Sequence, residues 1–113
     1  MRIEQIGDWT LEDRLAIGGK PLVVRFFEVG AKGEGAARKD FARIAARHPG
    51  ARFYEVDLVE NPSLGQRYSI AGAPLVIVFI NGVEVARQAG NLLATTVHRA
   101  LGTPEDPSDN ATD

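Results

Sequence analysis

The chain has 113 residues, of which 44% are hydrophobic and 25% charged, and its formal net charge at pH 7 is −2. This length suits a single domain with one proper core, and the intermixed charges argue against the basic face that nucleic-acid binding requires. The complete absence of cysteine excludes disulfides, thiolate metal sites and thiol nucleophiles.

The sequence shows no segment typical of export or of membrane insertion. Residues 1–9 contain three charged side chains and no apolar run, unlike a secretory signal. The longest apolar run, Ala73–Ile80, has the length of a strand and is far too short to span a bilayer. We therefore expect a cytoplasmic protein that does not engage a membrane.

Apolar periodicity, helix caps and turn residues predict alternating strands and helices. The predicted strands are Met1–Ile6, Leu22–Phe27, Arg52–Leu58, Pro74–Ile80 and Val83–Gln88. Four helices are predicted. The first begins at Asp8 and the second covers Ala36–Arg47. The third runs from Asn61-Pro62 to about Tyr68, and the fourth covers Leu92–Leu101. Residues 1–102 would form one domain, and the polar segment Thr103–Asp113 would be a disordered tail.

The first predicted helix has Asp8 as its N-cap and Gly18-Gly19 as its end. Its apolar stripe would consist of Trp9, Leu11, Leu15 and Ile17. We expect Trp9 to anchor this helix in or near the core.

The strand Leu22–Phe27 has an almost continuous apolar sequence, which is typical of a central strand buried on both faces. Its one charged residue, Arg25, needs a partner or a route to water, because an unpaired buried charge costs several kcal/mol.

Strand–helix alternation predicts parallel pairing, and Asn81-Gly82 predicts a tight hairpin that adds an antiparallel pair. The expected architecture is an α/β fold with three layers, α/β/α. A central mixed sheet of five strands, or at least four, would carry helices on both faces.

This element order carries a set of local matches to one known family. The matching residues are Phe26-Phe27, Val56-Asp57, Asn61-Pro62, Tyr68-Ser69-Ile70, Ala73-Pro74, Phe79, Asn81-Gly82 and Gly90. From Leu22 to Gly102 the sequence resembles the body of a bacterial thioredoxin. The resemblance implies the thioredoxin fold.

The departures from that family fall on its redox machinery. Where the family has the loop Trp-Cys-Gly-Pro-Cys-Lys, the aligned residues here are 30–35, with Ala31 and Glu34 in place of the cysteines. Arg25 takes the place of the family's buried aspartate, and we assign Phe53 to the position of the lysine beside it. Exchange requires thiolate attack on a disulfide sulfur, so we expect no dithiol–disulfide oxidoreductase activity and consider other catalysis disfavoured.

Two hypotheses concern Arg25. In one, its guanidinium pairs with Glu34 in the space of the family's aspartate and second cysteine. In the other, its stem extends to solvent or to Glu55. A guanidinium more than about 4 Å from every Glu34 oxygen would exclude the first.

The resemblance implies a cis peptide bond at Ala73-Pro74 and a groove in which the backbone before this proline receives an extended peptide. The candidate groove consists of Gly30, Ala31, Lys32, Gly33, Glu34, Ala73, Pro74 and Gly90. The alternative is that Pro74 only shapes the entry into the strand.

We expect no metal site and no cofactor. His48 and His98 are far apart in sequence, and we expect each to have a solvent-exposed structural role. Asp57, at a strand end, is expected to be structural. The glycines at 30, 33 and 35 do not match a phosphate-binding motif.

Three functions compete. The first is a redox-inactive protein- or peptide-binding, chaperone or assembly module that uses the former active-site groove, with an unidentified partner. The second is a scaffold or subunit with a vestigial groove. The third, ranked last, is a non-redox enzyme that uses Glu34. The sequence leaves the oligomeric state open.

Overall fold

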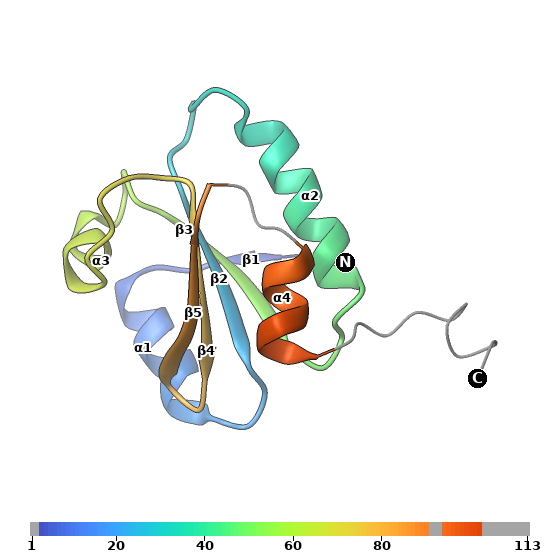
Figure 1. Ribbon diagram of the computed structural model, residues 1–113. Coiled ribbons are helices and arrows are strands. Elements are labelled where there is room, and N and C mark those ends of the chain that lie inside the picture. Colours follow the sequence, from blue (N-terminus) through green and yellow to red (C-terminus); the bar gives the residue numbers. More distant parts are fainter. Residues whose placement is uncertain (1–2, 91–93, 103–113) are drawn as a thin grey trace.

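The computed structural model describes residues 3–90 and 94–102. Within these ranges the chain forms one five-stranded mixed sheet with the strand order β1-β3-β2-β4-β5 (Figure 1). The strands are β1 (Glu4–Gln5), β2 (Leu22–Phe27), β3 (Arg52–Asp57), β4 (Leu75–Ile80) and β5 (Val83–Ala89). The helices are α1 (Asp8–Ile17), α2 (Glu34–Ala46), α3 (Pro62–Arg67) and α4 (Ala94–Leu101). The predicted α/β fold is confirmed.

The sheet is parallel on one side of β2 and antiparallel on the other. β3 pairs in parallel with both β1 and β2, whereas β4 is antiparallel to β2 and β5. Asn81 and Gly82 both have positive φ, as a tight two-residue hairpin between β4 and β5 requires. The predicted hairpin is therefore confirmed.

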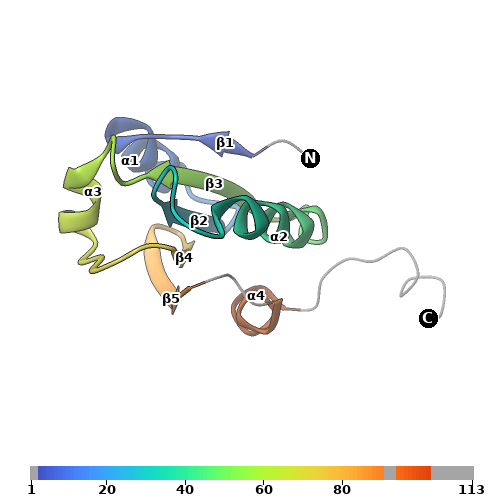
Figure 2. The same ribbon diagram turned by 90° about the horizontal axis from the view of Figure 1, so that it is seen from above.

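Helices cover both faces of the sheet, α1 and α3 on one and α2 and α4 on the other (Figure 2). The first face has a core built around Leu11, Val24 and Leu64. The second has a core built around Phe41, Val78 and Val97. All six residues of β2 are buried, because β2 is flanked by strands on both edges and covered on both faces. Burial at about 25 cal/mol per Å² of apolar surface makes these two cores the main source of stability.

Trp9 does not anchor α1 in the core, and that prediction is wrong. The buried side of α1 is set by Leu11, with Leu15 packing beside it. Successive helical residues are about 100° apart, so Trp9 lies roughly 200° around the helix from Leu11. Its side chain is accordingly 81% exposed, and Ile17 is exposed for the same reason.

Several predicted boundaries shift by one or two residues. Helix α1 begins at Asp8 itself, with Gly7 as the N-cap. Asn61 makes no side-chain cap on α3; its amide donates instead to the carbonyl of Asp57. Pro74 precedes β4 and is not part of it. The predicted start of the last helix and the predicted tail lie outside the described residues.

Helix α2 begins at Glu34, two residues before its predicted start. Gly33 is its N-cap, with φ of 82°, a conformation that glycine adopts without steric cost. The Ala37 N–H donates to the Gly33 carbonyl at 3.0 Å and closes the first turn. Glu34 therefore stands in the first helical turn, where a carboxylate is favoured by the helix dipole.

Candidate functional site

The predicted site residues lie where β2 ends and α2 begins, next to the peptide bond before Pro74. The Ala73–Pro74 bond is cis, as predicted. The Gly90 N–H donates to the Pro74 carbonyl at 2.8 Å. The loop before α2 is braced by its own backbone, since the Ala31 N–H donates to Glu28 and the Glu34 N–H to Ala31.

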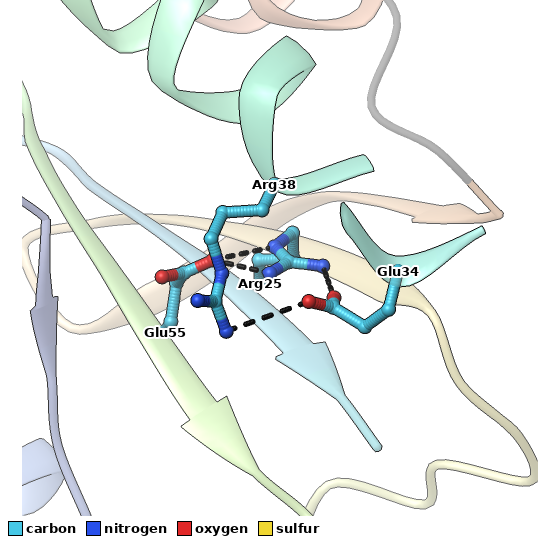
Figure 3. A network of polar contacts seen from close by, with 4 residues as sticks. All are labelled: Arg25, Glu34, Arg38 and Glu55. Carbon is cyan, nitrogen blue, oxygen red and sulfur yellow. Dashed lines mark hydrogen bonds and ion pairs between the residues drawn. The ribbon is translucent and has the colours of Figure 1, made fainter. Parts of the chain in front are cut away.

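Arg25 lies beneath this loop in a network of buried charges (Figure 3). Its guanidinium is hydrogen-bonded to both Glu34 and Glu55, and its Nε donates to Oε2 of Glu55 at 2.8 Å. Only 2% of Arg25 is exposed, so its stem does not reach solvent. The predicted Arg25–Glu34 pair is confirmed, and Glu55 is a second partner at the same time.

Two guanidinium groups balance two carboxylates in this network. Arg38, one turn along α2, reaches the second oxygen of Glu34 with Nη2 at 3.5 Å from Oε2. The Arg25 guanidinium also lies over the rings of Phe27 and Phe41, at 4.9 and 5.7 Å from their centroids. Such pairing and aromatic contact are what a buried arginine requires.

Phe53, which the resemblance aligns with the family's lysine, does not lie directly opposite Arg25. The parallel register of β2 and β3 places Glu55 opposite Arg25 and Phe53 opposite Val23. Phe53 is instead a core residue that packs edge-on against Phe41, with ring centroids 5.4 Å apart. On β3 the residue directly opposite Arg25 is therefore Glu55, which supplies the carboxylate that the buried guanidinium needs.

The contacts of Glu34 in this network matter for the hypothesis that Glu34 acts as a catalytic acid or base. Both of its carboxylate oxygens are engaged, Oε1 by Arg25 and Oε2 by Arg38. A general acid or base needs an oxygen within hydrogen-bond reach of the reacting proton. Both Glu34 oxygens are committed to arginines, and this pairing gives Glu34 a structural role that holds α2 against β2.

Above the network lies a small hollow of about 110 Å³, here called the loop hollow. Phe27, Ala31, Ala37 and Pro74 give it apolar walls, and the loop residues 32–34 and Glu28 complete it. Its size is of the order of one aliphatic side chain. Gly30, Ala73 and Gly90 are not part of its lining, so the structure gathers only part of the predicted groove around one cavity.

Two of the remaining candidate residues have backbone roles. Ala73 precedes the cis-proline, and no hydrogen bond to its backbone occurs within the part of the chain that the structure describes. Asp57 is buried, and its Oδ1 accepts a bond from the Val59 N–H at 2.9 Å. The predicted structural role of Asp57 therefore matches its geometry.

His98 is exposed, as expected, but the expectations that His48 is exposed and that the two histidines are apart are wrong. His48 is only 7% exposed, and its ring stacks edge-on with that of His98 on α4, at 5.9 Å between centroids. Burial lowers the pKa of His48, and repulsion from His98 and Arg47 lowers it further. No cluster of three or more potential metal ligands occurs among residues 3–90 and 94–102.

No helix among the described residues has the length and apolar character needed to cross a membrane. No protein-family model matches the chain. A curated relative, monothiol glutaredoxin-S17 of Arabidopsis thaliana, is 28% identical over 94 residues. The match covers 80% of this chain and 19% of that protein, so the chain spans about a fifth of its relative's length.

Solved structures share the fold at low sequence identity. Thioredoxin f2 of Chlamydomonas reinhardtii superposes with a TM-score of 0.83 at 19% identity, covering 90% of this chain and 99% of that one. Fasciola hepatica thioredoxin gives 0.78 at 22%, covering 88% and 96%. A designed protein gives 0.81 at 20%, covering 89% and 99%.

These comparisons establish that the chain has the thioredoxin-like fold. It also contains no cysteine. The sulfur atoms that dithiol–disulfide exchange requires are therefore missing from an otherwise complete scaffold.

Proposed function

We propose that this chain is a redox-inactive thioredoxin-like module that binds an extended segment of a partner protein in the former active-site groove. The observation that carries the proposal is the loop hollow, which keeps apolar walls beside the cis-proline although the cysteines are replaced. A vestigial groove would be expected to fill with larger side chains, yet Ala31 leaves space there. Chaperone and assembly roles are forms of this binding function.

The binding mode follows from the neighbouring backbone. An extended peptide placed beside Ala73 would find an N–H and a carbonyl without partners among the described residues. Main-chain hydrogen bonds of this kind provide affinity, and a side-chain pocket provides selectivity. The Arg25 network beneath the loop keeps the pocket in shape without a disulfide.

Display selection on random dodecapeptides tests the proposal. The purified chain is immobilised, and recovered peptides are titrated against it while backbone amide shifts are followed by NMR. We expect shifts around Ala31, Ala73 and Pro74. Replacing Ala31 with Phe fills the loop hollow and should abolish binding, whereas Ala36→Phe, an equal change at an exposed site on α2, should not.

A peptide that shifts backbone amide signals on another face of the protein would contradict binding in the groove. So would a peptide that binds the A31F variant as tightly as the wild type. Recovery of no peptide above background would favour the alternative of a scaffold with a vestigial groove.

A further inference from the structure

A second and larger hollow, of about 500 Å³, adjoins the loop hollow and shares Glu28 with it. We call it the α3 groove, because it follows α3 and the segment that leads from α3 towards Pro74. Its apolar surface comes mainly from Leu58, Pro62 and Ile70. It is a shallow groove that is open to solvent, and its volume lies within the range of protein ligand sites.

Glu28 is the one ionisable residue in the lining of the α3 groove. Within the described residues its carboxylate has neither an ion pair nor a hydrogen bond. The arginines of the adjoining elements are neutralised locally, since Arg67 pairs with Glu12 and Arg87 with Glu84. The groove therefore presents one unpaired carboxylate in a lining that is otherwise uncharged, with apolar residues and the polar side chains of Gln66 and Ser69.

Two exposed apolar residues follow the carboxyl ends of β2 and β3. They are Val29 and Val59, and each is 65% exposed. Both side chains are therefore available for apolar contact with a bound segment. They suit a partner with apolar residues on either side of its charge.

We propose that the α3 groove receives a lysine or arginine side chain of the partner segment, and this inference rests on the proposed function. The methylene stem would lie on Leu58 and Ile70, and the cationic head would meet Glu28. A long basic side chain matches both properties of the groove, whereas an acidic one would be repelled by Glu28. The partner is therefore a basic, apolar-flanked peptide segment.

The experiment compares display selections on three proteins: the wild type, Glu28→Gln, and Asp13→Asn. The Asp13 variant removes one exposed carboxylate on α1 that lines neither hollow. We expect lysine or arginine to be enriched at one position by the wild type and by D13N but not by E28Q. Replacing that residue with norleucine should weaken binding to the wild type about five-fold and leave binding to E28Q unchanged.

The outcomes separate the two proposals. The proposed role of the α3 groove would be overturned, and the proposed function would stand, in two cases. In the first, the selected peptides need an open loop hollow but show no enrichment of lysine or arginine. In the second, the E28Q variant enriches lysine or arginine as the wild type does. If no peptide binds the wild type, both proposals fail together.

Discussion

At the scale of single residues, the charged network beneath the loop is the most unusual feature of this protein. The side chains of Arg25, Glu34 and Glu55 are largely withdrawn from water and paired with one another. Removing one member of a buried set leaves its partners uncompensated, which costs more than the intact set contributes. The network therefore acts as one unit.

We predict that Arg25→Met lowers the free energy of unfolding by about 3–5 kcal/mol. The reason is that Glu55 and Glu34 would keep their charges without a buried partner. Urea denaturation measures the change. Arg38→Met is the matched control, because Arg38 is half-exposed and its loss should cost less than about 1 kcal/mol.

The combined variant R25M/E34L/E55M removes all three charges together and should recover most of the lost stability. Equal losses for R25M and R38M would contradict a buried, mutually dependent network.

At the scale of elements, a ring contact links α4 to the segment that follows α2. Val97 is fully buried in the second core, and His98 next to it meets the ring of His48. His48 also lies near Phe53 of β3, at 6.5 Å between ring centroids. The charged groups that face His48 are His98 from α4 and Arg47 from its own segment.

We predict that stability falls as the pH is lowered from about 7.5 to 5. The pKa of His48 is lowered in the folded state, first by burial and then by His98 and Arg47. The unfolded chain therefore binds a proton more readily, and the free energy of unfolding decreases as pH falls below the ordinary histidine pKa of about 6.5. Thermal or urea unfolding across this range measures the slope.

His48→Gln should flatten this slope, whereas His98→Gln should reduce it only in part, because burial is the larger cause. A full slope in the H48Q variant would show that another group is responsible.

At the scale of the whole molecule, the strands differ in how well their neighbours in the sheet protect them from local opening. β2 and β4 each pair on both edges, whereas β5 lies at one edge of the sheet and its side chains are largely exposed. β1 at the other edge has only two residues. Stability against local opening is thus expected to decrease from the centre of the sheet outwards.

We predict the slowest amide hydrogen exchange in β2 and β4, for example at Val24 and Ile77, which are completely buried. Residues of β5 should exchange faster, because one of its edges faces no other strand of the described sheet. Exchange measured by NMR in the native state tests this order. Equal protection along β2 and β5 would mean that the β5 edge is covered, for instance by another chain.

The fold was predictable because its signals are local. Asn81-Gly82 predicts a hairpin from two residues, and the sequence Leu22–Phe27 predicts a doubly buried strand from six. The pairing of Arg25 with Glu34 was also predictable, because they are nine positions apart and a buried charge needs a partner. Arg38 stands four residues after Glu34 on α2, a spacing that signals contact on a helix.

The sequence by itself determined that thiol–disulfide chemistry is absent. It also determined the order of the strands and helices along the chain, because composition and periodicity are properties of the chain alone. Only the tertiary structure decided that Glu55 rather than Phe53 lies beside Arg25, that Trp9 faces outwards, and that His48 meets His98. These features depend on strand register and helix orientation. Both are set by packing between residues that are 30 or more positions apart in the sequence, such as Arg25 and Glu55. A shift of one residue in the register would reverse which side chains face each other.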